Sequence, residues 1–273
     1  MTMPGDKEDG MGCLGFRSGR GGAHTARTMM LEELELLMAH VPGENAKKEV
    51  YIHAIQTDNC LAKRSGQTRK LSARHLIELY SLDPDATLFR VLRYFWMRDP
   101  QSHKLLALLS AYTRDNVLRL SAPFMLGIQE GSPVNKIELE AFIDNLEPGR
   151  FSRATLKSAA RNLNSTWTKS GHVKGRVRKI RSRAVPSAGS VAYALFLGYL
   201  RGIRGPALFE TEYAKLLDCS VQRAIELSEE ASRKGWIVVK RVGTVIEVLF
   251  PHLLTPEEKE WVREQNQPTY QVL

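Results

Sequence analysis

The side chains with the clearest chemistry in this sequence are cations gathered in one stretch. Residues 148–209 contain 13 Lys and Arg residues and no Asp or Glu. The chain has 39 basic and 30 acidic residues, so the remainder carries 26 basic against 30 acidic, a net charge of −4. This stretch therefore supplies the whole positive balance. Because Lys and Arg bind phosphate, and Arg can donate two hydrogen bonds to one phosphate or guanine, nucleic acid is the first partner to consider.

The cations of this stretch fall into two groups. The first is a row with a spacing of four, which a helix stacks on one face: Arg153, Lys157 and Arg161. The second is a denser run of seven: Lys169, Lys174, Arg176, Arg178, Lys179, Arg181 and Arg183. A charge run can be a solvated face or a flexible tail. The matching row before it and the neutral donors between them, such as Asn162 and Asn164, favour DNA binding instead.

A second basic cluster opens a predicted helix near residue 68. Its members are Lys63, Arg64, Arg69, Lys70 and Arg74. Cations in the first turn of a helix oppose the helix dipole, which is locally unfavourable unless an anion binds there. Lys63, Arg64, Arg69 and Lys70 are therefore further candidate DNA contacts, and simple solvation explains the cluster equally well.

Patterns of catalytic and metal-binding residues are absent from the sequence. There is no G-x-S-x-G, no phosphate-binding loop and no H-E-x-x-H, and the seven His are scattered. Cys13, Cys60 and Cys219 form no C-x-x-C pair, which disfavours both a disulfide framework and a cysteine zinc site. Cys219, beside a predicted helix start, is more typical of a small buried residue than of a nucleophile. We expect no enzyme activity, no metal and no cofactor.

The elements that must position these cations divide the chain into four predicted parts. Residues 1–28 are expected to be a disordered Gly-rich leader. Residues 29–130 read as a helical bundle, with helices over about 45–57 and 68–82 and two more begun by Asp83-Pro84 and Asp99-Pro100. In this bundle, periodicity favours core packing for the aromatic residues Phe89, Tyr94, Phe95 and Trp96.

Two predicted modules follow the bundle. Residues 131–186 contain helices near 133–143 and 151–167, the second capped by Ser152, and then the basic run. This order is typical of a basic winged helix-turn-helix. Residues 187–273 repeat it with helices over about 192–200, 210–217 and 220–234, the last capped by Ser220, and a hairpin, 236–241 with 245–250. Because the last of these helices is close to neutral, we interpret the second module as a docking element. The fold class is mainly α, a bundle with two winged-helix-like modules and short β-hairpin wings.

Membrane segments are not expected. The longest apolar run, 191–200, is far below the roughly 20 residues that cross a bilayer, and the N-terminus has no apolar signal-peptide core. Together with the cysteine usage, this favours the cytoplasm.

The order of these motifs resembles the BrxA family of BREX bacteriophage-exclusion systems over about residues 45–252. The resemblance rests on the stretch Asn59–Ser65 before a basic helix, on Asp83-Pro84, on Phe151–Thr155 leading to Gly171, and on Gly235-Trp236-Ile237 through Leu249-Phe250-Pro251. It implies a mainly helical protein with winged-helix parts that binds double-stranded DNA in an antiphage complex, with other BREX proteins as further partners.

The expected function is thus a non-enzymatic DNA-binding accessory protein that contacts mainly backbone phosphates. Replacing Arg176, Arg178, Lys179 and Arg181 by Ala should then weaken binding alike for all DNA sequences. One alternative is a scaffold whose basic face docks a partner enzyme of the defence complex. Another is a winged-helix transcriptional regulator, which would need a dimer and a palindromic site.

Overall fold

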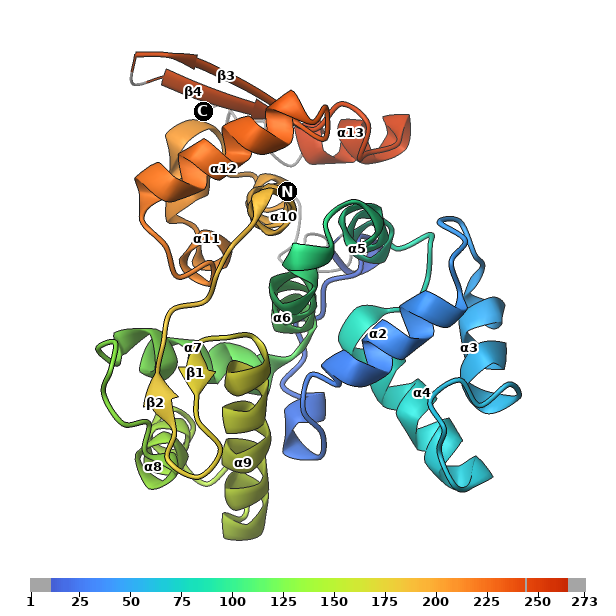
Figure 1. Ribbon diagram of the computed structural model, residues 1–273, viewed down its shortest axis with the longest axis vertical. Helices are drawn as coiled ribbons and strands as arrows, with labels where there is room; N and C mark the ends of the chain where they lie inside the picture. Colours follow the sequence, from blue (N-terminus) through green and yellow to red (C-terminus); the bar gives the residue numbers. More distant parts are fainter. Residues whose placement is uncertain (1–10, 244, 265–273) are drawn as a thin grey trace, which may run out of the picture.

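The computed structural model describes residues 11–243 and 245–264, which form a mainly helical protein with two small antiparallel β-hairpins (Figure 1). The first helices, with η marking 3-10 turns, are η1 (Ala23–Thr25), α2 (Leu31–His40), α3 (Lys48–Gln56), α4 (Gly66–Tyr80), α5 (Thr87–Arg98), η2 (Pro100–Ser102), α6 (His103–Arg114) and α7 (Asn116–Gly127). The later helices are α8 (Lys136–Leu146), α9 (Arg153–Lys169), α10 (Ala188–Leu200), η3 (Gly205–Glu210), α11 (Glu212–Lys215), α12 (Val221–Arg233) and α13 (Pro256–Glu264). The hairpins are β1 (Val173–Lys174) with β2 (Ile180–Arg181), and β3 (Val238–Val242) with β4 (Val245–Leu249).

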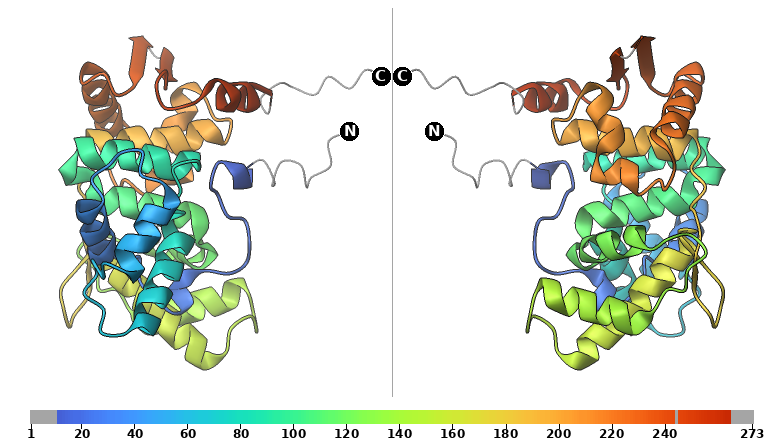
Figure 2. Two further views of the ribbon diagram at one scale, coloured as in Figure 1. Left: turned by 90° about the vertical axis from the view of Figure 1, so that its right-hand side faces the viewer. Right: turned by 90° about the vertical axis from the view of Figure 1, so that its left-hand side faces the viewer.

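The hairpins lie in different parts of the molecule. In Figure 1, β1–β2 lies with α7, α8 and α9, and β3–β4 lies with α11 and α12. Figure 2 shows α8 and α9 at one end and β3–β4 at the other, with α5, α6 and α10 between. A cationic surface on α9 is thus remote from the C-terminal hairpin.

Serine side chains cap the N-termini of α9 and α12. The hydroxyl of Ser152 accepts a hydrogen bond from the Thr155 N–H at 3.2 Å and caps α9. The hydroxyl of Ser220 does the same for the Arg223 N–H, also at 3.2 Å, and caps α12. Both predicted caps are confirmed, as expected for Ser at a position whose side chain satisfies an orphan helix N–H.

The core is continuous along the chain. Buried apolar side chains from Leu14 to Val262 belong to one cluster, and α10 is buried at almost every position. Phe89, Phe95 and Trp96 are buried in it, which confirms core packing for these members of the aromatic cluster. The predicted domain boundaries near residues 130 and 186 stay predictions. No helix among the described residues combines the length and the apolar character that crossing a bilayer requires.

Two predicted helix starts are wrong in detail. Asp83 does not cap α5: its carboxylate accepts the Asp85 N–H at 3.1 Å in a turn, and the helix begins at Thr87. The helical segment predicted to open at Asp99-Pro100 does begin there, because Pro100 is the first residue of η2 and η2 runs directly into α6. The buried Asp99 carboxylate, however, does not cap it and accepts the Gly189 N–H at 2.8 Å instead. Both Asp carboxylates thus bond to other backbone groups in competition with capping.

The prediction of a disordered leader is wrong for residues 11–28. Leu14, Phe16 and His24 are buried, and the backbone N–H of Leu88 bonds to the Leu14 carbonyl at 3.0 Å. Gly22 permits close packing in this segment, because a Cβ at this position would overlap the Asp115 carboxylate. The remaining leader residues 1–10, Thr244 in the predicted C-terminal turn and the chain end 265–273 lie outside the described residues.

Candidate nucleic-acid interface

The first part of the candidate interface is the outer face of α9. Arg153, Lys157 and Arg161 are all exposed, so the predicted row is confirmed. No acidic side chain among the described residues forms an ion pair with them. On the opposite face Trp167 is fully buried, and its indole N–H donates to the Ser121 hydroxyl of α7 at 3.0 Å. The buried face thus fixes the helix, and the cationic face is left to solvent.

The second part is the β1–β2 hairpin beside α9 (Figure 1). Lys174 at the end of β1 is exposed, as are Arg176 and Arg178 in the connecting turn, and none of these forms an ion pair within the described chain. Gly175 has a φ of +96°, and an added Cβ would overlap the Arg178 carbonyl, so this tight turn requires glycine. The predicted wing is therefore an ordered hairpin, although its strands are only two residues long.

Lys179 links the hairpin to α9 instead of pointing freely into solvent. Its ammonium donates to the Thr168 hydroxyl at 3.0 Å and to the Gly175 carbonyl at 2.8 Å. Half-buried and hydrogen-bonded in this way, it holds the turn against the helix. Its charge still adds to the potential of the surface.

Arg181 is not a DNA contact, which corrects the sequence-based assignment. Its side chain is 4% exposed, and its guanidinium pairs with both carboxylate oxygens of Asp218, at 2.7 and 2.8 Å. The same guanidinium donates to the Met125 carbonyl at 3.0 Å and the His172 carbonyl at 3.2 Å. Strand alternation turns Arg181 inward while the turn residues before it face water.

Lys169 and Arg183 are engaged by acidic partners at the edges of the interface. Lys169 pairs with Glu32 of α2, and Arg183 pairs with Glu130 at 3.0 Å. Both partners of the second pair are more than half exposed, so this pair contributes little and opens readily. These two residues are weaker candidates than the six exposed cations that have no acidic partner among the described residues: Arg153, Lys157, Arg161, Lys174, Arg176 and Arg178.

The second basic cluster lies at the start of α4, away from the α9–hairpin surface (Figure 1). Lys63 pairs with Glu33 at 2.9 Å, and Arg69 is half-buried. Arg64 and Lys70 are exposed and have no acidic partner among the described residues. Ser65 caps the helix, accepting the Thr68 N–H at 3.2 Å. The structure does not bring this cluster into contact with α9.

A buried network under α9 was not foreseen from the sequence. The His24 ring contacts the Asp115 carboxylate at 2.8 Å through Nδ1 and the Thr166 hydroxyl at 2.9 Å through Nε2. Burial opposes ionisation of Asp115, but His24 and the Leu118 N–H outweigh it and lower the pKa of this carboxyl. No short-range signal could reveal it, because the partners are 91 and 142 residues apart.

This hydroxyl–imidazole–carboxylate order is not a nucleophilic triad. His24 and Thr166 are fully buried, and Thr166 Oγ1 already accepts the Met29 N–H at 2.9 Å. A substrate could not reach the hydroxyl, so the network serves to hold residues 24–29 against α9.

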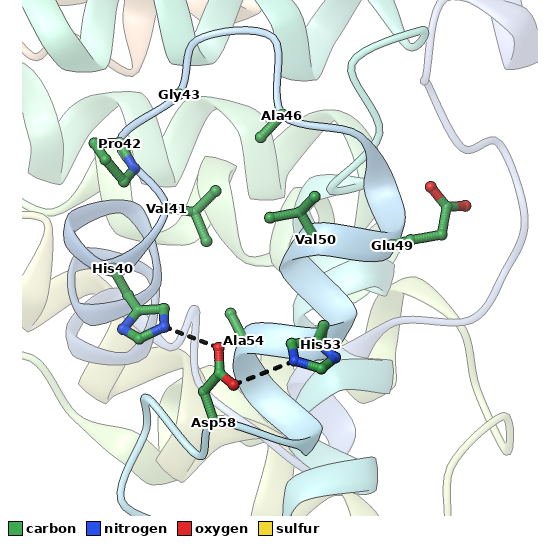
Figure 3. Close-up of a pocket in the computed structure, with 10 residues that line it drawn as sticks. All are labelled: His40, Val41, Pro42, Gly43, Ala46, Glu49, Val50, His53, Ala54 and Asp58. Carbon is green, nitrogen blue, oxygen red and sulfur yellow. Dashed lines mark hydrogen bonds and ion pairs between the residues drawn. The ribbon is translucent and has the colours of Figure 1, made fainter.

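A pocket of about 640 Å³ lies between α2 and α3 (Figure 3). Its walls are mainly aliphatic, and the Asp58 carboxylate lies between His40 and His53, at 3.1 and 3.3 Å. The lining contains no Ser, Thr, Cys or Lys that could act as a nucleophile. Among the described residues no group of His, Cys, Asp and Glu side chains is arranged to hold a metal ion.

The charges of the C-terminal hairpin and α12 are largely paired with one another. Arg241 of β3 pairs with Glu229 of α12 at 3.6 Å, and Lys240 pairs with Glu247 across the hairpin at 3.3 Å. This surface is electrostatically self-compensated, unlike that of α9. Comparison of the chain with protein-family models finds no match, and comparison with curated proteins finds none either.

Proposed function

We propose that this protein is a non-enzymatic double-stranded DNA-binding protein that contacts mainly the phosphate backbone through α9 and β1–β2. The observation that carries the proposal is the set of six exposed cations without acidic partners on one helix and the hairpin beside it. Each unpaired surface cation that neutralises a phosphate releases counterions condensed on the DNA, and this release drives binding.

We propose that α7 also belongs to the winged-helix module predicted over residues 131–186, so that this module begins at residue 116. Three helices, α7, α8 and α9, precede the hairpin. An isolated antiparallel β-bridge between Pro133 and Ile180 also pairs the segment before α8 with strand β2. In such modules the third helix enters the major groove and the wing lies along the backbone. The helix α8 carries the exposed Glu138 and the half-buried Asp144 and Glu140, the last paired with Lys136 at 3.5 Å, so a duplex would approach from the α9 side.

Little base reading is expected at this surface. Asn162 and Asn164 are each 7% exposed, and Asn162 donates to the His24 carbonyl at 3.0 Å. These amides are therefore not available for base edges, which corrects the expectation that they contribute donors. With Lys and Arg as the dominant exposed groups, affinity should depend weakly on sequence.

A salt titration of duplex binding tests the proposal. Fluorescence anisotropy on a labelled duplex of about 30 base pairs should give a log–log slope near −5 if about six phosphates are neutralised. Replacing Arg153, Lys157 and Arg161 by Ala should flatten that slope by about 3. The matched control replaces Lys104, Lys215 and Arg233, which are also exposed and without ion pairs in the described chain, and should leave it unchanged. Absence of duplex binding by the wild-type protein would refute the proposal.

A scaffold role is the second candidate, and the C-terminal hairpin favours it. Val242 and Val245 are 80% and 67% exposed at its tip, beside charges that are already paired. Such a surface suits a protein partner better than phosphates. The resemblance to BrxA proteins extends both candidates to an accessory role in phage exclusion, where other BREX proteins would be the partners. Tight binding at one DNA sequence only would instead favour a transcriptional regulator.

A further inference from the structure

The segment of residues 17–29 joins α9 to α4. On the α9 side, the His24 carbonyl accepts a hydrogen bond from Asn162 at 3.0 Å. On the α4 side, Arg17 pairs with Glu78 at 3.3 Å, and the Tyr80 hydroxyl donates to the Met29 carbonyl. In Figure 1 the blue turn η1 lies beside α9, on the side that faces α4. We call residues 17–29 the strap.

The strap and α4 present further cations to solvent. Arg27, Lys70 and Arg74 are exposed, and Lys70 and Arg74 are one helical turn apart on α4. None of the three forms an ion pair with an acidic residue that the structure describes. Arg27 and Arg74 both act on His75: after burial, each guanidinium helps to lower the pKa of this imidazole.

Two acidic residues beside this path, Glu78 and Glu32, are paired with basic side chains. Glu78 contacts Arg17 at 3.3 Å and His75 at 3.5 Å. Glu32 pairs with Lys169 at the end of α9, and this contact, against an opposing effect of burial, lowers the pKa of Glu32. A phosphate backbone that follows the strap would therefore meet the unpaired cations. It would not be repelled by an unpaired carboxylate of Glu78 or Glu32.

We infer that one DNA duplex extends from the α9–hairpin surface across the strap to α4, where Arg27, Lys70 and Arg74 contact its phosphates. The inference rests on the proposed function, because α9 must hold the duplex first. A duplex is stiff over far more than the width of this protein, so contacts beyond the first module must lie along its straight path. The order hairpin, α9, η1 and α4 across the lower half of Figure 1 supplies such a path.

A series of duplex lengths tests the inference. We would compare the wild-type protein with the triple variant Arg27→Ala, Lys70→Ala, Arg74→Ala on duplexes of about 10 and about 30 base pairs, the first being roughly one helical turn. The Lys104→Ala, Lys215→Ala, Arg233→Ala protein is the charge-matched control. The triple variant should bind the short duplex like wild type, bind the long one at least about tenfold more weakly at low salt, and lose about 3 from its salt slope.

The outcomes separate this inference from the proposed function. Wild-type binding to both duplexes, with the triple variant equal to the control on each, would overturn the extended path and leave the α9 surface intact. Equal weakening on both lengths would also overturn it, because one helical turn would already reach α4. If the wild-type protein binds neither duplex, the proposed function itself fails.

Discussion

Arg181 and Asp218 form a two-pronged ion pair that joins the first hairpin to the loop before α12. Nη1 lies 2.7 Å from one carboxylate oxygen and Nη2 lies 2.8 Å from the other. The Asp218 carboxylate also accepts the Ala184 N–H at 3.2 Å. The contact connects the cationic α9 region to the C-terminal part of the chain through buried charges, and its role is structural.

Replacing Asp218 by Ala should destabilise the protein by about 3 to 5 kcal/mol, because the buried Arg181 guanidinium would lose its counter-charge. Urea unfolding followed by circular dichroism measures this. The control is Arg183→Ala, which breaks only the exposed pair with Glu130 and should cost less than about 1 kcal/mol. Equal stability of the two variants would show that the buried pair contributes nothing specific.

His172 should make stability depend on pH. Burial lowers its pKa to about 4, an effect that Asp218 partly opposes and Arg181 reinforces. The unfolded chain takes up this proton near pH 6.5 and the folded protein only near pH 4, so stability is lost as the pH falls through that window. The titration of His172 alone should lower the free energy of unfolding by about 2 kcal/mol as the pH falls from 7 to 5.

The variant His172→Gln isolates that contribution. It removes the titrating group, so the difference in unfolding free energy between pH 7 and pH 5 should shrink by about 2 kcal/mol. The other ionisable groups are the same in both proteins, so their contributions cancel in the comparison. A pH dependence as large as that of the wild-type protein would contradict the prediction.

The hairpin turn should contribute to DNA binding without reading sequence. The triple variant Lys174→Ala, Arg176→Ala, Arg178→Ala should flatten the salt slope by about 3 and weaken binding equally on unrelated duplexes. Arg181 is excluded from this variant, because its loss would unfold the site instead of removing a contact. An unchanged slope would remove the hairpin from the interface.

Structural features that depend on residues close together in the sequence were predicted correctly. The caps Ser152 and Ser220 and the cationic row of α9 were predictable, since spacings of three and four residues decide them. Arg181 was misassigned because its partner Asp218 is 37 residues away and the run gives no sign of which cation turns inward. The strap was missed for the same reason, since its contacts are made with α4, α7 and α9, far away in the sequence, and its glycines look like those of a linker.

His24 should be the anchor that holds the strap on α9. His24→Ala would leave the buried Asp115 carboxylate and Thr166 hydroxyl without their partner, at a cost of about 1 to 3 kcal/mol or more. His24→Asn should fall between this variant and wild type, because its amide can still donate to Asp115 from near the Nδ1 position.

Urea unfolding ranks the three proteins, and His53→Ala provides the control. The His53 side chain is 63% exposed and contacts Asp58 at the surface at 3.3 Å, so its loss should change stability by less than about 1 kcal/mol. If His24→Ala were as stable as His53→Ala, the strap would not be anchored by this network. The ranking wild type, Asn, Ala would instead show that both contacts of the imidazole stabilise the fold, because the amide restores only one of them.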